Sequence, residues 1–302
     1  MRPLGPCCRT ATVVSALLLV LTGCTDPSGD QLPVRIGAGS TTEQQVLAAL
    51  TTELLRRSDM PAEIVSELGD TVDVRDQALD GRIDVYWDYS GAAWALSLGL
   101  TAPPINPEES FEVVADEEAG NGLKWVGPTP IDASLALFVQ SSRLPSDQEQ
   151  TLSWLAGQFG GSSAALCADG EYLAAPSGYS YLVETYAIAR DQVTTRALTE
   201  GKALADTASG QCLAGLASAT SGVARTLGLQ ALDDDLGVFP ALVIAPVVAA
   251  EGRGDQPDVI DLLDRLAKVL TAETLADLNG QAVGGAPIDQ LAGSFLDDVG
   301  LP

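Results

Sequence analysis

The first hundred residues of the body alternate between short apolar runs and amphipathic stretches. The apolar run 33–39 ends in small residues, and the segment Ser40-Thr41-Thr42-Glu43 then carries N-cap and capping-box side chains before an amphipathic helix through Arg57. A strand at 64–68, a helix at 71–79 closed by Gly81, and a strand at 83–87 follow. This β-α-β-α-β order predicts parallel strands covered by helices on both faces.

A second block of alternating pattern begins after the turn Gly127-Pro128-Thr129-Pro130. Its expected strands, with helices between them, are 135–140, 164–168 and 212–217. An apolar run at 238–248, interrupted by Pro240 and Pro246, precedes helices expected at 259–270, at 272–279 and in a last segment ending near Gly300. Two successive sets of βα units followed by a return predict two α/β lobes with a cleft between them.

Ligands of open α/β sheets bind at the carboxyl ends of the strands. In the first block those ends carry Ser40, Thr41 and Thr42, and then Tyr89, Ser90 and Gly91. The hydroxyl residues would also cap a helix, which alone would explain them, but a cap at a cleft can offer backbone N–H groups to a ligand as well. We therefore place all six in the candidate ligand site.

The charge and the residue content of the chain exclude several classes of function. There are 41 acidic and 16 basic side chains, a balance that disfavours nucleic acid and anionic lipid surfaces as partners. The chain has no histidine, which removes the Ser-His-Asp arrangement and most zinc sites. We expect a binding protein that is not an enzyme and that uses no cofactor and no metal.

The start of the chain has the pattern of an export signal. Arg2 and Arg9 precede an apolar run of about 11 residues, which is too short to span a bilayer. Leu21-Thr22-Gly23-Cys24 resembles a bacterial lipobox, so we expect a signal peptide at 1–23, acylation of Cys24 and a polar tether at 24–32. The alternative is an ordinary signal with a chance cysteine. Either way, the body would lie outside the cytoplasm.

Two cysteines, Cys167 and Cys212, remain in the body. In an oxidising compartment they most simply form a disulfide, with two separate buried thiols as the alternative. Such a bridge would close a loop of about 45 residues, which stabilises by about 4 kcal/mol in the loop-entropy model.

Four segments together resemble the osmoprotectant-binding proteins, the glycine betaine, carnitine and choline-binding components of ABC importers. These segments are VRIGAGSTTEQQ (34–45), LDGRIDVYWDYSG (79–91), ALVIAPVV (241–248) and LTAETLADLNGQAV (270–283). The resemblance implies a type II periplasmic-binding-protein-like fold with two mixed sheets, lobe I at 33–130 and 240–302, and lobe II at 131–239. It further implies a monomer that captures a small polar or zwitterionic solute and delivers it to ABC permease and ATPase subunits.

The resemblance also implies a cage of tyrosines that holds quaternary ammonium through cation–π attraction. Of its four positions only Tyr89 carries a ring here; Leu135, Ser218 and the neighbourhood of Leu204 correspond to the other three, and Ala92 replaces a threonine of the Tyr89 motif. Ser134 and Thr220 lie in the matching stretches, and Tyr179 could supply another ring, so these three complete the candidate site. The alternative is a lipid-anchored sensor or structural protein that has lost betaine binding.

Overall fold

A computed structural model describes residues 32–100, 104, 106–144, 150–160 and 165–302. The signal peptide, Cys24 and all of the tether except Leu32 lie outside the described residues. Pro33–Pro302 form one compact unit. Within the described part of the chain, no helix is both long enough and apolar enough to cross a membrane.

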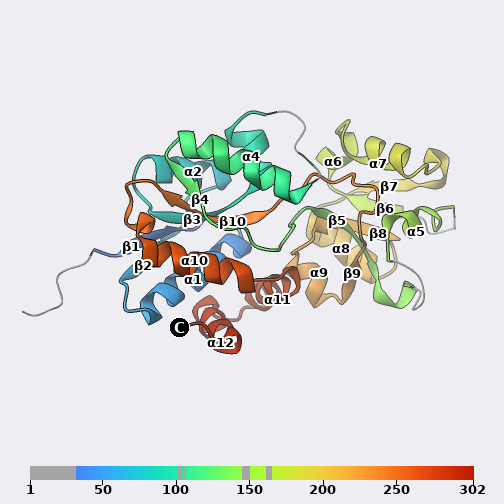
Figure 1. Ribbon diagram of the computed structural model, residues 1–302. Coiled ribbons are helices and arrows are strands. Elements are labelled where there is room, and N and C mark those ends of the chain that lie inside the picture. Colours follow the sequence, from blue (N-terminus) through green and yellow to red (C-terminus); the bar gives the residue numbers. More distant parts are fainter. Residues whose placement is uncertain (1–31, 101–103, 105, 145–149, 161–164) are drawn as a thin grey trace, which may run out of the picture. The chain divides into compact units, whose positions relative to one another are not determined.

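The first of two sheets has five strands in the order β2-β1-β3-β10-β4. Its strands are β1 (Val34–Gly37), β2 (Ala62–Val65), β3 (Val85–Tyr89), β4 (Leu123–Trp125) and β10 (Ile244–Ala249). The helices α1 (Thr42–Arg57), α2 (Thr71–Leu79), α3 (Ser90–Ala92), α4 (Pro107–Gly120), α10 (Pro257–Val269), α11 (Ala272–Val283) and α12 (Ile288–Val299) come from the same two stretches of chain (Figure 1). β1, β2 and β3 are parallel, whereas β10 runs antiparallel to β3 and β4.

The second sheet repeats this arrangement, in the order β7-β6-β8-β5-β9. Its strands are β5 (Leu135–Gln140), β6 (Ala165–Ala168), β7 (Thr194–Ala197), β8 (Ala214–Ser218) and β9 (Leu229–Ala231). Its helices are α5 (Leu152–Ala156), α6 (Gly170–Ala174), α7 (Tyr179–Thr185), α8 (Glu200–Ala208) and α9 (Gly222–Thr226). β6 is parallel to β7 and β8, and β5 is antiparallel to β8 and β9. Each sheet therefore has four strands that run in one direction and a single reversed strand, β10 in the first and β5 in the second.

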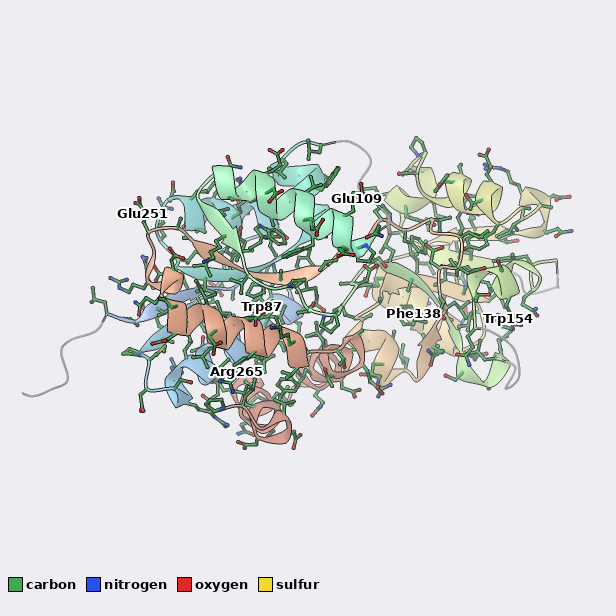
Figure 2. The ribbon with its side chains drawn as sticks, in the orientation of Figure 1. Trp87, Glu109, Phe138, Trp154, Glu251 and Arg265 are labelled. Atoms are coloured by element: carbon green, nitrogen blue, oxygen red, sulfur yellow. A yellow bond between two sulfur atoms is a disulfide. The ribbon has the colours of Figure 1, made fainter. Side chains whose placement is uncertain are left out.

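Both faces of the first sheet are covered by helices. One face packs against α1, α10, α11 and α12, and the other against α2 and α4 (Figure 1). Trp87 of β3, labelled in Figure 2, lies in the core beneath α1, where its indole N–H donates to Thr51 Oγ1 at 2.8 Å. The hydrogen bond satisfies the polar end of a side chain that is otherwise buried among aliphatic residues.

A disulfide joins Cys167 in β6 to Cys212 just before β8, with the two Cα atoms 6.0 Å apart. Both cysteines are buried, together with Ala203 of α8. The bridge therefore connects two neighbouring parallel strands next to the helix α8. This is the pairing that was expected from the sequence.

Two antiparallel stretches connect the sheets, one between β4 and β5 and the other between β9 and β10. They meet at an isolated bridge between Asp132 and Val243, and the Ala133 N–H donates to Leu242 O at 2.9 Å. The Asp132 carboxylate also accepts the Leu242 N–H at 2.9 Å. The crossing between the two sheets is thus a short hydrogen-bonded ribbon.

The predicted fold class, two mixed sheets with flanking helices, is confirmed. Strand β2 begins two residues earlier than predicted, and β4, β7, β9 and α4 were not predicted as elements. The three missed strands have three or four residues each and lie at sheet edges, where one-sided pairing leaves a weak hydrophobic pattern.

Candidate functional site

A cavity of about 320 Å³ lies where the carboxyl ends of parallel strands from the two sheets meet. The first sheet contributes residues that follow β1 and β2 and the last residue of β3. The second sheet contributes a residue that follows β7, the last residue of β8 and residues just after it. Two residues of α11 complete the lining. The lining side is formed by Thr41, Thr42, Glu43, Gln44, Thr71, Tyr89, Glu200, Ser218, Thr220, Ser221, Gly222, Val223, Asn279 and Val283. This is where an open α/β sheet binds its ligands.

The first turn of α1 forms one wall. Thr41 is the N-cap: its hydroxyl accepts the Gln44 N–H at 3.2 Å, and Gln44 Oε1 accepts the Thr41 N–H at 3.3 Å. The capping box therefore uses Thr41 and Gln44, one residue later than the Ser40–Glu43 pattern. As a consequence, the Glu43 carboxylate is free to act in the cavity.

Glu43 stands at the centre of a hydrogen-bonded chain. Its Oε1 accepts the Tyr89 hydroxyl at 2.7 Å, and its Oε2 accepts Asn279 Nδ2 at 2.8 Å. The same amide nitrogen also donates to Thr220 O at 3.1 Å, so the chain reaches the second sheet. Burial, followed by the charge of Glu43, raises the pKa of Tyr89 well above its ordinary value, so the phenol stays neutral and donates its proton.

The second sheet contributes a further carboxylate. Glu200, the first residue of α8, accepts the Ser221 hydroxyl at 3.1 Å. Partial burial, followed by the charges of Asp169 and Glu43, raises the pKa of Glu200 despite that hydrogen bond. Asp169 and Glu43 are thus each near enough to Glu200 to repel its negative charge.

These contacts define the chemistry of the cavity. It combines an aromatic ring, two carboxylates and several hydroxyl groups, and none of its lining residues is Lys or Arg. Within the described residues no group of three or more potential ligands could hold a metal ion. The arrangement suits the recognition of a small solute that carries positive charge, with Tyr89 available for cation–π contact.

Four of the nine predicted ligand residues line this cavity: Thr41, Thr42, Tyr89 and Thr220. The other five, Ser40, Ser90, Gly91, Ser134 and Tyr179, do not.

Each of these five has another setting. The Ser40 N–H donates to Gly69 O, and the Ser134 N–H donates to Asp132 Oδ1 beside the connecting ribbon. The buried hydroxyl oxygens of Ser90 and Ser110 are hydrogen-bonded at 2.7 Å. Gly91 packs so closely against Ala241 that a Cβ added to the glycine would overlap the Ala241 carbonyl oxygen. Tyr179 packs on the core of the second sheet with Arg190 over its ring, 5.8 Å from the centroid.

Of the positions that correspond to the family's tyrosine cage, some line the cavity and others do not. Ser218 lines the cavity, whereas Leu204 is fully buried in the core between α8 and β5, and Leu135 lies outside the lining. Glu200 and Asn279 were not predicted as site residues. Glu200 follows a strand that was itself missed, and Asn279 lies within an amphipathic helix, where nothing local marks it as functional. Glu43 lay within a quoted motif, but its pattern suggested a helix cap.

A larger cavity, of about 590 Å³, lies at the opposite ends of the first sheet's strands. Its charged residues serve the fold. Burial raises the pKa of Asp84, but hydrogen bonds from the Arg35 side chain and backbone and from the Arg253 N–H hold it below the ordinary value. Arg35 and Asp84 thus neutralise each other within the fold.

Two α/β sheets joined by a crossing ribbon, with a polar cavity at the strand ends of both, define a solute-binding protein. The chain matches the family described as the substrate binding domain of ABC-type glycine betaine transport systems over residues 33–298. It belongs to that family, and it is therefore a substrate-binding component of an ABC importer, a class that works outside the cytoplasm.

Relatives support the assignment along nearly the whole body. The chain is 27% identical to the glycine betaine-binding protein YehZ of Escherichia coli, over 94% of this chain and 96% of that protein. It is 26% identical to a glycine-betaine-binding protein of Pseudomonas aeruginosa, over 82% of this chain and 81% of that protein. The solved structure of apo YehZ from Escherichia coli superposes with a TM-score of 0.81 at 25% identity, covering 90% of this chain and all of that one.

Proposed function

We propose that this chain captures a small ammonium-bearing solute of the osmoprotectant class in the 320 Å³ cavity and delivers it to the importer's permease and ATPase subunits. The observation that carries the proposal is the joint lining of one cavity by the strand ends of both sheets, with Tyr89 on one side and Thr220 on the other. The names of the relatives supply the solute class, since two of them are called glycine betaine-binding proteins.

Capture would involve closure of two lobes about the ribbon between Asp132 and Val243. We propose lobe I at 33–130 with 240–302 and lobe II at 131–239. The repeated sheet order supports this division, because each proposed lobe then contains one complete five-stranded sheet. In the described part of the chain, two antiparallel stretches carry the backbone from one sheet to the other, and a crossing of this kind allows hinge motion.

We further propose that Cys24 is acylated after removal of residues 1–23, which would hold a monomeric body on the outer face of the cell membrane. The support lies in the lipobox-like sequence before Cys24 and in the extracytoplasmic role of the family. Incorporation of labelled palmitate that is lost in Cys24→Ala would test the anchor.

The incomplete tyrosine cage is the feature that motivates the alternative, a sensor or structural protein without a ligand. A closed cleft without a pocket would support this alternative, whereas a cavity of about 320 Å³ is present at the strand ends of both sheets.

Solute capture can be tested on the compact unit Pro33–Pro302. In a thermal-shift screen of compatible solutes, amino acids and related cations, at least one should raise the Tm, because a ligand that binds only the folded state stabilises it. With that solute, Tyr89→Ala should weaken binding by about tenfold or more, a loss of roughly 1.4 kcal/mol in binding free energy. Tyr181→Ala is the control, since Tyr181 is 43% exposed and lies outside the cavity. No stabilisation by any solute at millimolar concentration would contradict the proposal.

A further inference from the structure

Several hydrogen-bond donors on the cavity's lining side chains are already engaged within the protein. The Tyr89 hydroxyl and one hydrogen of Asn279 Nδ2 are engaged by Glu43, and the second hydrogen of that amide is engaged by Thr220 O. The Ser221 hydroxyl is likewise engaged by Glu200. The side-chain donors of Tyr89, Asn279 and Ser221 therefore already face acceptors of the protein itself.

The acceptors, by contrast, keep free capacity. An ionised carboxylate offers about four acceptor positions. Glu43 accepts two hydrogen bonds and Glu200 accepts one, so both retain open positions. Asn279 is only 5% exposed, and its Oδ1 has no hydrogen-bond partner. A ligand that complements these groups must bring hydrogen-bond donors.

The charges around the cavity also favour a cationic ligand. Glu43 and Glu200 line the cavity, Asp169 lies near enough to act on Glu200, and no lining residue carries a positive charge. The N-terminus of α1 would favour an anion, but Glu43 in its first turn already supplies that negative charge. A carboxylate on the ligand would find no cationic partner and would face two like charges.

From these observations we infer that the solute is a net cation with N–H donors, such as a protonated amine or an amidinium, rather than a quaternary ammonium or a zwitterion. The inference rests on the proposed function, since it concerns the same cavity. A protonated amine can lie against the Tyr89 ring as a quaternary group does, and it can also donate to the open positions on Glu43 and Glu200. A fully methylated nitrogen can make only the first of these contacts.

Six probes of similar size test separately whether the ligand needs N–H donors and whether it needs a net positive charge. Ethanolamine, N,N-dimethylethanolamine and choline are cations, of which only the first two carry N–H; glycine, N,N-dimethylglycine and glycine betaine are their carboxylate counterparts. We would measure the affinity of each at pH 7 by calorimetry on Pro33–Pro302. The better of the two N–H cations should bind at least tenfold more tightly than choline, and at least tenfold more tightly than its own carboxylate counterpart.

The role of the second carboxylate is tested with Glu200→Gln, which keeps the size of the side chain and removes its charge. Binding of the best N–H cation should weaken about tenfold, whereas glycine betaine should bind no more weakly than before. Glu184→Gln is the matched control: it makes the same change in the same sheet's helices, on an exposed residue outside the cavity, and should alter neither affinity.

The outcomes are distinguishable. If choline or glycine betaine binds as tightly as the N–H cations, or if Glu200→Gln behaves like Glu184→Gln, the inference is wrong while solute capture stands. If none of the six probes binds and the wider solute screen also finds no ligand, the proposed function fails together with the inference.

Discussion

Asp88 is a fully buried carboxyl directly behind the ligand-facing Tyr89 on β3. Its Oδ1 accepts the Tyr89 N–H at 2.8 Å, and the buried Tyr86 hydroxyl lies near the same carboxyl group. Burial raises the pKa of Asp88 to about 7, with the charge of Glu118 adding to the effect and Arg75 opposing it. Near neutral pH, the residue that fixes the backbone of Tyr89 is thus close to its titration point.

This shift predicts a specific pH dependence of stability. The folded protein keeps a proton on Asp88 between about pH 4 and pH 7, where the unfolded chain has lost it, so the free energy of unfolding due to this group falls as pH rises. Between pH 5 and pH 8 the loss amounts to about 2–3 kcal/mol. Asp88→Asn removes this component, so its stability relative to the wild type should rise by that amount over the same range.

Urea unfolding of the wild type and Asp88→Asn at pH 5 and pH 8 measures the difference. Asp116→Asn is the control, because Asp116 is exposed on α4, beside the same sheet, and should leave the pH dependence unchanged. Parallel pH curves for Asp88→Asn and the wild type would show that Asp88 is ionised throughout.

The single residues of the site show what the sequence can predict. Tyr89 and Thr41 follow strands with clear patterns, so the switch-point rule locates them. Glu200 and Asn279 enter the cavity only because β7 and α11 pack where they do, and no local pattern contains that information. Ser90 and Gly91 were predicted for the site because they adjoin Tyr89, but the chain turns into α3 there, and both face the connecting ribbon.

Among the elements, α9 and α11 make the close approach that brings the second sheet against the first sheet's helices. Gly222 in the first turn of α9 lies directly on the α11 backbone, where an added Cβ would overlap Asn279 and Gly280. Arg225 of α9 also pairs with Glu273 and Asp277 of α11 on the exposed side, although such surface pairs contribute little. Backbone contact at Gly222 therefore sets the separation of the two helices.

Gly222→Ala should force α9 away from α11. We expect a loss of roughly 1–3 kcal/mol in the free energy of unfolding, typical of overpacking. Solute binding should also weaken about tenfold, because Ser221 and Val223 on one helix and Asn279 on the other line the same cavity. Gly201→Ala on α8 is the matched control, since no atom lies within 4 Å of the added carbon.

Urea unfolding and calorimetry with the best solute measure the two effects. Wild-type stability and affinity in Gly222→Ala would mean that the helices can separate without consequence, and that α11 does not fix the geometry of the cavity.

The predictability of the elements follows their position in the sheets. The bounds of β5 and α2 agree with the predicted ranges residue for residue, because each has a clear apolar pattern bounded by turn residues. β7 consists of Thr194–Ala197 and is largely exposed at an edge, so no alternation marks it. Pairing with β6 decides that it is a strand, and pairing is a property of the folded sheet.

At the scale of the whole molecule, two sheets of the same strand order differ in how they are stabilised. The first sheet lies between two layers of helices and includes the larger hydrophobic core. The second has smaller clusters and the Cys167–Cys212 disulfide, which links β6 to the chain just before the neighbouring parallel strand β8. A covalent link in the sheet with less apolar burial fits a protein that folds in an oxidising compartment.

The bridge encloses a sequence separation of 45 residues, for which the loop-entropy model gives about 4 kcal/mol. A variant with both Cys167→Ala and Cys212→Ala should therefore unfold at lower urea concentration, with a loss of that order. Its unfolding should not respond to reductant, whereas wild-type protein denatured and reduced beforehand should refold only to the variant's stability.

Thiol titration of Pro33–Pro302, denatured without reductant, should count no free thiol. Two thiols per chain would show that the cysteines are separate and would remove the covalent contribution from the second sheet.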